Sequence, residues 1–237
     1  MNKIPKHIGI ILDGNRRFAR KLMLKPWKGH EWGYKKIEQL FDWCKEIGIP
    51  ELTLYTFSVQ NFNRPKNEFD YLMNLFNEAF GKLIREKDLP ENKQKLDQIQ
   101  IQFIGRTWMF PQEVQENMRK LSELTKNNGP YTVNFAMAYG GREEVLDAVK
   151  KIADSVKKGK LDIDSINEES FSKKLYLQSE PELIIRTGGD HRTSNFLIWQ
   201  SHYSEWFFLE KTWPEFEKED LLQVINEFST RERRFGK

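Results

Sequence analysis

The chain has 237 residues, of which 38% are hydrophobic and 31% charged, and its formal net charge is +3. This composition suits a globular α/β domain and argues against disorder, and so small a net charge gives no support by itself for binding nucleic acid or an anionic membrane. The single cysteine excludes an intramolecular disulfide, and Cys44 lies on an apolar helical stripe, so we expect a buried structural thiol.

Strand and helix signals alternate along the first half of the chain. We predict strands where short apolar runs stop at turn residues, over residues 8–12, 52–57 and 99–104. We predict helices where apolar residues recur every three or four positions, over residues 31–47, 69–83 and 114–124. The polar segment 86–97 contains a proline and is predicted to be a loop or a mobile insert.

The same alternation continues in the second half. Strand signals cover residues 132–138, 182–186, 195–199 and 206–209, and helices are expected from Arg142 and over 218–228. The pattern predicts one α/β domain over residues 1–237, with a mostly parallel sheet flanked by helices. In such sheets, ligands bind beyond the carboxyl ends of the strands.

The first strand ends in Asp13-Gly14-Asn15-Arg16-Arg17. Gly14 permits a tight turn and a close ligand, and free amides at a helix start near Arg16 would favour a phosphate. A carboxylate beside a phosphate is unfavourable unless a Mg²⁺ ion bridges the two, so Asp13 indicates a magnesium site. The alternative is an Asp-Gly turn with a solvated basic face.

The second strand is followed by a segment over residues 57–65 that mixes hydroxyl, amide, guanidinium and aromatic groups. Such a loop could hold an anionic head and an apolar tail together. The alternative is an ordinary surface loop before a helix, with Pro65 near its first turn.

A third polar segment, residues 185–196, follows the strand at 182–186. It contains Arg186 and Arg192, two glycines and Ser194. Arginine forks bind phosphate oxygens in a bidentate manner, so this segment could neutralise a diphosphate. The alternative is a charged surface turn.

The tail over residues 229–237 and the absence of common motifs add further constraints. Phe235 and Gly236 interrupt the tail's charges, which indicates a docked turn, although such tails are usually solvated. The sequence has no nucleotide-binding glycine motif, no zinc spacing and no Asp-Asp pair. Its 17 Phe and 7 Trp suit either a packed aromatic core or an apolar cavity for a lipid-like ligand.

Taken together and in this order, the segments closely resemble the cis-prenyltransferase family, which comprises undecaprenyl and dehydrodolichyl diphosphate synthases. The resemblance runs from about Lys6 to Gly236. It rests on residues 7–19, Gly29-His30, 54–58 with 61–65, 139–142, 185–189 with 192–200, Glu205, Trp213-Pro214 and 233–236. Arg16, Phe18 and Ala138 are more similar to the archaeal and eukaryotic branch.

The resemblance implies a Mg²⁺-dependent transferase. Such an enzyme sequentially condenses isopentenyl diphosphate with an allylic diphosphate, farnesyl or geranylgeranyl diphosphate, into a long-chain cis-polyprenyl diphosphate. The product would be the precursor of a glycosyl-carrier lipid, and its chain would occupy an apolar tunnel between the sheet and helices. The implied protein is a homodimer, binds no nucleic acid, and is cytoplasmic with peripheral membrane contact for product release.

The resemblance also assigns roles to residues. Asp13 and Asn61 would be catalytic, and Asp13 and Glu205 would hold the metal. The substrates would be bound by Gly14, Asn15, Arg16, Arg17, Phe18, His30, Ser58, Phe62, Arg64, Arg186, Arg192, Thr193 and Ser194. The tail residues Arg234, Phe235 and Gly236 would reach the site of a second subunit.

Two points remain open from the sequence. The family often has Arg just before Gly29, where this chain has Pro26, and either Lys25 or Lys28 could supply that charge. Some relatives are non-catalytic subunits of heteromeric enzymes, which is the main alternative function. Those relatives tend to lack the aspartate at the first turn, which this chain has as Asp13.

Overall fold

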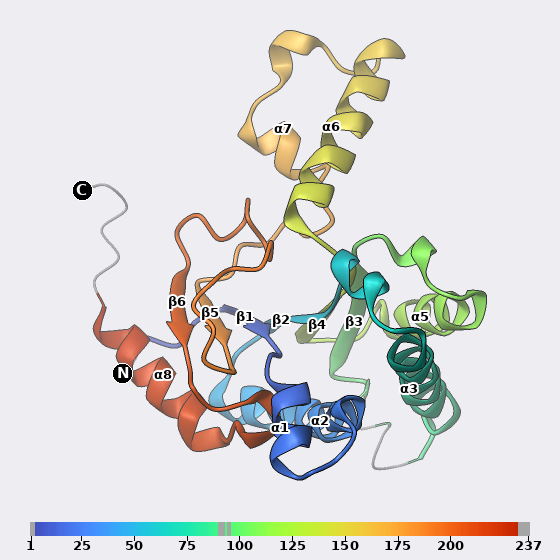
Figure 1. Ribbon diagram of the computed structural model, residues 1–237. Coiled ribbons are helices and arrows are strands. Elements are labelled where there is room, and N and C mark those ends of the chain that lie inside the picture. The colour runs from blue at the N-terminus through green and yellow to red at the C-terminus, as the bar shows by residue number, and fades with distance from the viewer. Residues whose placement is uncertain (1–2, 90–92, 94–95, 232–237) are drawn as a thin grey trace.

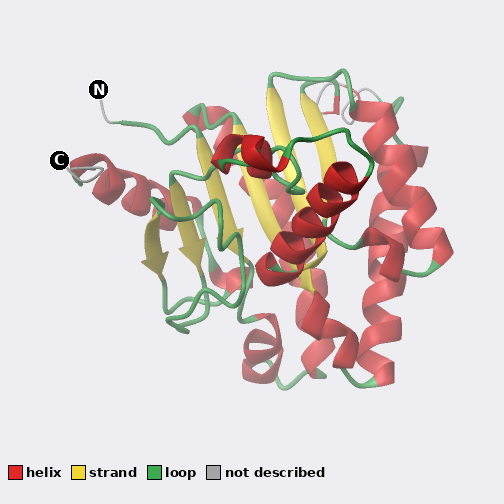
Figure 2. Cartoon of the chain, turned by 90° about the horizontal axis from the view of Figure 1, so that it is seen from above, coloured by secondary structure: helices red, strands yellow, loops and turns green. Residues whose placement is uncertain are grey.

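The protein is described by a computed structural model covering residues 3–89, 93 and 96–231 (Figure 1). Its centre is a six-stranded sheet in the order β3-β4-β2-β1-β5-β6. All neighbouring strands pair in parallel, and their arrowheads point the same way in Figure 2. The strands are β1 (His7–Ile11), β2 (Glu51–Ser58), β3 (Ile99–Ile104), β4 (Tyr131–Tyr139), β5 (Leu183–Arg186) and β6 (Glu205–Phe208). The predicted α/β fold with a parallel sheet is confirmed.

Helices connect the strands and cover the sheet. They are α1 (Asn15–Lys21), α2 (Gly29–Ile47), α3 (Lys66–Arg85), α5 (Gln112–Thr125), α6 (Gly141–Lys157), α7 (Glu168–Ser172) and α8 (Lys218–Thr230). Short 3₁₀ helices occupy Pro26–Lys28, Val59–Asn63, Thr107–Met109, Ile163–Ser165 and Trp213–Glu215. No helix in the described part of the chain is long and apolar enough to cross a bilayer.

The two faces of the sheet are covered differently. Helices α8, α2 and α3 lie along one face, and α6 and α7 project from the opposite side (Figure 1). The larger apolar core lies on the first face and includes Leu54, Phe57 and Phe80. A smaller core on the other face includes Tyr55 and Phe196. Because both faces are covered, every residue of β1 is buried, as expected for a central parallel strand.

Helix α2 ends where the sequence predicts. Gly48 adopts φ 87°, and its N–H donates to the carbonyl oxygen of Cys44, so the chain leaves the helix through a left-handed residue. Cys44 itself is buried, and burial raises the pKa of its thiol to about 12. The prediction of a structural thiol is therefore confirmed.

The prediction of a strand over residues 195–199 is wrong. Asn195 and Leu197 have φ values of 64° and 45°, which a strand cannot accommodate. The segment forms turns instead, and these turns insert Phe196 and Leu197 fully into the smaller core. The apolar residues of this segment are thus explained by burial in the smaller core and not by a strand. The segment 86–97, predicted to be a loop or insert, contains helical residues at Lys93 and Leu96.

Candidate active site

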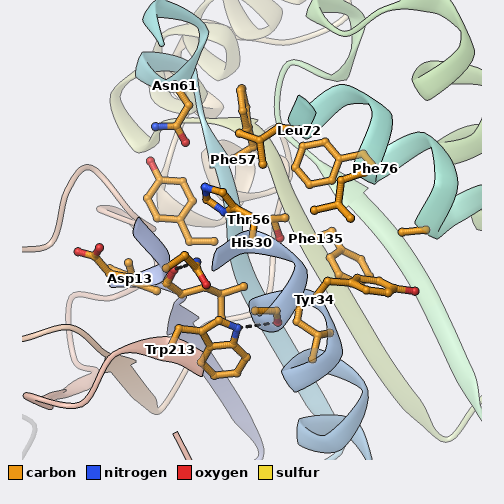
Figure 3. Close-up of a pocket in the computed structure, with 18 of the residues that line it drawn as sticks. Asp13, His30, Tyr34, Thr56, Phe57, Asn61, Leu72, Phe76, Phe135 and Trp213 are labelled. Atoms are coloured by element: carbon orange, nitrogen blue, oxygen red, sulfur yellow. Dashed lines mark hydrogen bonds between the residues drawn. The ribbon is translucent and has the colours of Figure 1, made fainter. Parts of the chain in front are cut away.

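A cavity of about 1030 Å³ opens at the carboxyl ends of β1, β2 and β5. It continues between the sheet and helices α2 and α3. In Figure 3, polar side chains such as Asp13 and Asn61 border one side, and aromatic side chains such as Phe76 and Phe135 border the other. The cavity therefore joins a charged mouth to an apolar interior.

The mouth is built on the turn after β1. Gly14 has φ 101°, and a Cβ atom added there would lie 2.6 Å from the Cβ of Thr212, so only glycine fits. The turn is tied to the neighbouring strand end, because the Thr187 hydroxyl donates to the carbonyl oxygen of Asp13 over 2.8 Å. These contacts fix the direction of the Asp13 side chain.

Asp13 is surrounded by donors. Its Oδ1 accepts a hydrogen bond from the Gly14 N–H over 2.6 Å, and its Oδ2 accepts one from Nη2 of Arg186 over 2.8 Å. Nη2 of Arg17 lies 3.3 Å from Oδ1. The carboxylate is 30% exposed, so it faces the cavity while its charge is balanced by two guanidinium groups.

Arg186 organises a second cationic group at the same mouth. Its side chain is only 3% exposed, and its Nη1 donates to Oγ of Ser194 over 2.7 Å. Its Nε is buried and has no hydrogen-bond partner. Arg192 and Arg17 both pair with Asp190, over 2.8 and 3.1 Å. Several fixed donors thus converge where an anion could be bound.

A further cationic group lies at the start of α3. The buried carboxylate of Glu68 accepts a hydrogen bond from Nη1 of Arg64 over 3.1 Å. Arg16 Nε and His30 Nε2 each lie 3.8 Å from the same oxygen. Burial lowers the pKa of His30 below its ordinary value, so its ring is neutral at pH 7. Glu68 thus holds Arg64 and Arg16 together at the cavity edge.

Asn61 and Ser58 lie on the loop after β2. The Ser58 N–H donates to Oδ1 of Asn61 over 3.0 Å, and the Ser58 side chain accepts from the backbone of Asn61. This reciprocal cap orients the Asn61 amide, which faces the cavity in Figure 3. A neutral polar group is therefore fixed close to the charged mouth.

The interior of the cavity is apolar and lies between α2, α3 and the sheet. Phe76 and Phe80 stack with ring centroids 6.1 Å apart, and Phe80 packs edge-on to Phe103 at 4.9 Å. The wall that they help to build includes Phe41, Phe57, Leu72, Phe76, Ala79, Phe80, Ile101 and Phe135. This confirms an apolar cavity, one of the two interpretations of the aromatic composition.

The structure brings most of the predicted site residues into one cavity. Its lining includes Asp13, Gly14, Asn15, Arg16, Arg17, His30, Ser58, Asn61, Arg64, Arg186, Arg192 and Ser194. The sequence reasoning missed Thr56, Gln60, Asp190 and Trp213, which also line it. Trp213 donates its indole N–H to the carbonyl oxygen of Gly33 over 2.8 Å and closes one side (Figure 3). Trp213 belongs to the Trp213-Pro214 pair on which the family resemblance rests, and that was the available signal.

Three residues predicted to bind substrate lie outside the lining. Phe18 faces away and packs edge-on to Trp32, with ring centroids 5.7 Å apart. Phe62 packs among the rings of Phe57 and Phe69. Thr193 is exposed. These three residues therefore lie on the predicted segments but not in the cavity wall, and their roles in binding substrate stay predictions.

The prediction that Asp13 and Glu205 share a metal is not supported within one chain. Glu205 begins β6 opposite Leu183, at the amino end of the sheet, whereas Asp13 follows the carboxyl end of β1. The carboxylate of Glu205 accepts from Arg231 over 2.7 Å. The predicted tail residues 234–236 lie outside the described residues. Lys25 and Lys28 do not line the cavity.

The carboxylate of Asp13 at the mouth suits a Mg²⁺ ion that is shared with a substrate. Among residues 3–89, 93 and 96–231, no group of three or more acidic, His or Cys side chains could hold a metal alone. Mg²⁺ is, however, commonly bound by one or two carboxylates together with substrate phosphates. Asp13, partly exposed beside several guanidinium groups, fits this type of site.

Comparison with known proteins gives consistent matches over the whole chain. The family model described as "Putative undecaprenyl diphosphate synthase" matches residues 11–236. The chain is 45% identical over 237 residues to a tritrans,polycis-undecaprenyl-diphosphate synthase (geranylgeranyl-diphosphate specific) of Methanopyrus kandleri, covering 99% of this chain and 86% of the relative. It is 46% identical over 236 residues to the enzyme of the same name from Pyrococcus furiosus, covering 99% and 88%.

Solved structures agree. Lavandulyl diphosphate synthase from Lavandula x intermedia, in complex with dimethylallyl diphosphate, has a TM-score of 0.91 and 32% identity, with 99% of both chains covered. A probable undecaprenyl diphosphate synthase from Campylobacter jejuni has a TM-score of 0.80 and 31% identity, with both chains fully covered. The predicted fold and the similarity to archaeal sequences are confirmed.

Proposed function

The chain belongs to the cis-prenyltransferase family, and from this premise we propose that it condenses isopentenyl diphosphate repeatedly with geranylgeranyl diphosphate. The matched family model and the curated relatives are named as synthases, and the names of the relatives state geranylgeranyl specificity. The product is then a long-chain cis-polyprenyl diphosphate, a precursor of a glycosyl-carrier lipid. Farnesyl diphosphate is the alternative primer.

One observation carries the proposal. Asp13, Arg64, Arg186 and Ser194 all line the mouth of a cavity whose interior is apolar and about 1030 Å³ in volume. Two diphosphates held side by side repel each other, and the cationic groups at this mouth offset that repulsion. The apolar interior suits a hydrocarbon chain and excludes water that would quench a developing carbocation.

The residues support a division of roles at the mouth. Arg186, Arg192 and Ser194 bind the diphosphate of isopentenyl diphosphate, with the unpaired Nε of Arg186 as an additional donor. The turn at Gly14 and the arginines that Glu68 aligns, Arg16 and Arg64, bind the allylic diphosphate. This separation would place the allylic C1 beside the double bond that attacks it.

The chemistry is an ionisation-assisted alkylation. The allylic C–O bond breaks as the isopentenyl double bond attacks C1, the diphosphate leaves, and the new unit then loses a proton. Asp13 would hold Mg²⁺, which supplies charge neutralisation to the leaving diphosphate. Asn61, oriented by Ser58, positions a water molecule for the proton loss.

We further propose a homodimer whose tail residues 234–236 complete the neighbouring site. Deleting residues 234–237 is expected to raise the KM for isopentenyl diphosphate more than the KM for the primer. Identical kinetics for the shortened and full chains would remove the tail from the site. Size-exclusion chromatography with light scattering measures the oligomeric state of both proteins.

The central experiment uses the purified chain alone. Radiolabelled isopentenyl diphosphate and Mg²⁺ are supplied with geranylgeranyl or farnesyl diphosphate, and the products are separated by chromatography. Long labelled polyprenyl products, formed fastest with geranylgeranyl diphosphate, are expected. Absence of product with either primer would instead support the alternative, a non-catalytic subunit of a heteromeric enzyme.

A further inference from the structure

The connection between α1 and α2 exposes apolar side chains to solvent. Leu22, Met23 and Leu24 are 44%, 94% and 43% exposed, and Trp32 on the first turn of α2 is 49% exposed. The connection projects at the lower edge of the molecule in Figure 1. Single exposed apolar residues need no explanation, but four on one projecting edge do.

The charge of the chain is concentrated on the same segment. Residues 15–36 contain eight Lys and Arg but only one acidic residue, Glu31, whereas the net charge of the whole chain is +3. The remainder of the chain is therefore net acidic. An asymmetry of this kind indicates an anionic binding partner.

Some of these cations pair with carboxylates, and three do not. Lys21, Lys28 and Lys36 pair with Glu215, Glu31 and Glu217. In contrast, Arg20, Lys25 and Lys35 are exposed and have no carboxylate within 4.0 Å among the described residues. Lys25 and Lys35 lie over the rings of Trp27 and Trp32, at 5.5 and 6.0 Å from the ring centroids. Their ammonium groups are thus available next to the apolar side chains.

We propose that this basic–apolar tip, residues 20–25 with Trp32 and Lys35, docks on the surface of an anionic lipid bilayer. The leucines, Met23 and Trp32 would enter the interface, while Arg20, Lys25 and Lys35 pair with lipid phosphates. Tryptophan and long basic side chains are the residues that prefer this boundary, since each combines an apolar body with a polar end.

A bilayer explains the tip better than a protein partner does. Stable protein interfaces bury about 800 Å² on each partner. A projecting turn with four apolar side chains offers a small convex surface, but it suffices for shallow insertion into lipid. Phe18 supports this interpretation, because it packs on Trp32 at the tip rather than lining the cavity.

The tip is also placed usefully for the reaction. Arg20 belongs both to the tip and to the lining of the cavity, so a docked tip would bring the cavity mouth close to the lipid headgroups. This inference rests on the proposed function, in which the product is a diphosphate with a long hydrocarbon chain. Such a product would pass from the mouth into the bilayer without crossing bulk water.

Co-sedimentation with vesicles tests the proposal on the intact protein. The wild type is expected to bind vesicles of equal phosphatidylcholine and phosphatidylglycerol at low salt and to bind pure phosphatidylcholine at least about tenfold more weakly. Met23→Asp should reduce binding to the anionic vesicles at least about tenfold. Asp tolerates the φ of 56° at this position, so the substitution should not disturb the turn. Lys25→Gln with Lys35→Gln should weaken binding by a similar factor.

Matched controls separate the tip from general effects. Ile163→Asp replaces an apolar side chain that is 66% exposed elsewhere, and Lys157→Gln with Lys160→Gln removes two exposed lysines elsewhere. These controls should bind vesicles as the wild type does. Equal binding by Met23→Asp and the wild type would overturn the proposal, as would a change of oligomeric state caused by Met23→Asp.

The result is distinguishable from a failure of the proposed function. Condensation in detergent solution, without vesicles, measures catalysis alone, and Met23→Asp should retain it because Met23 does not line the cavity. If the protein catalyses condensation in detergent but does not bind anionic vesicles, the docking proposal is wrong and the proposed function stands. If the protein binds vesicles through the tip but makes no product, only the proposed function is wrong.

Discussion

The carboxylate of Asp13 and the guanidinium of Arg186 meet across the ends of β1 and β5, with Oδ2 and Nη2 2.8 Å apart. The two residues are 173 positions apart in sequence. The parallel pairing of β1 with β5, which aligns Ile11 with Arg186, brings them together. Both members of the pair line the cavity mouth.

Replacing Asp13 tests the acidic member of this pair. Asp13→Ala should keep the fold and reduce turnover at least ~10²-fold, because the mouth loses its main metal-binding carboxylate. Steady-state condensation kinetics and circular dichroism measure the two effects. Glu210→Gln is the control, since the Glu210 side chain is 87% exposed and lies outside the cavity lining. A wild-type rate for Asp13→Ala would exclude the proposed role.

Arg186→Lys tests the basic member while keeping its charge. A lysine has a single donor nitrogen and no planar fork, so it cannot reproduce the geometry in which the two Nη atoms of Arg186 bond Asp13 and Ser194. The KM for isopentenyl diphosphate should rise about tenfold or more, with a smaller change for the primer. Residue 186 is itself buried, with only 3% of the Arg186 side chain exposed, so a less well-paired ammonium there should also cost about 1–3 kcal/mol in the free energy of unfolding. If both KM values rise equally, Arg186 does not distinguish the two diphosphates.

The sequence predicted which segments meet better than which side chains enter the cavity. Twelve predicted residues line it because strand ends and glycine turns can be recognised locally, and parallel strands place those ends at one edge. Phe18 and Phe62 do not line the cavity, and a loop motif does not specify which side of the loop faces it. Only the tertiary packing onto Trp32 and Phe57 determines that.

Register explains the other differences. Glu205 is the first residue of β6, and the parallel pairing that sets it opposite Leu183 puts it at the amino end of the sheet, away from Asp13. Glu68 was not singled out because a glutamate on the first turn of a helix is usually solvated. Its role in holding Arg64 and Arg16 becomes visible only when α1 and α3 are placed together.

The buried histidines make stability depend on pH. His7 is 3% exposed, its Nε2 lies 2.8 Å from Oγ1 of Thr53, and burial lowers its pKa below the ordinary value of 6.5. Burial lowers the pKa of His30 as well. Below about pH 6.5, these two histidines therefore bind protons in the unfolded chain more readily than in the folded protein. The free energy of unfolding should fall as the pH drops from 7 to 5.

Urea unfolding at pH 7.5, 6.0 and 5.0 measures this dependence. His7→Gln should retain a hydrogen bond to Thr53 and flatten the slope, because one proton-linked group is removed. Ile8→Val on the same strand is the control, since it lowers stability by about 0.5–1.5 kcal/mol without changing a titratable group. The same slope in His7→Gln and the wild type would show that His7 does not contribute.

Ala79 tests whether the apolar cavity limits the length of the product. Its small side chain is buried on α3 and lines the cavity beside Phe76 and Phe80. Ala79→Phe would place a ring into the space that a growing chain occupies, so products should shorten by roughly one or more five-carbon units. Because Ala79 lies away from the charged mouth, the KM values for both diphosphates should stay within about twofold of the wild type.

Mass spectrometry of the extracted products gives the length distribution. Glu78→Phe is the matched control, because Glu78 is exposed on the same helix and its replacement leaves the cavity unchanged. If Ala79→Phe unfolds the protein, Ala79→Leu adds less volume and should give an intermediate shift. An unchanged distribution in a folded Ala79→Phe variant would mean that the hydrocarbon chain does not pass beside Ala79.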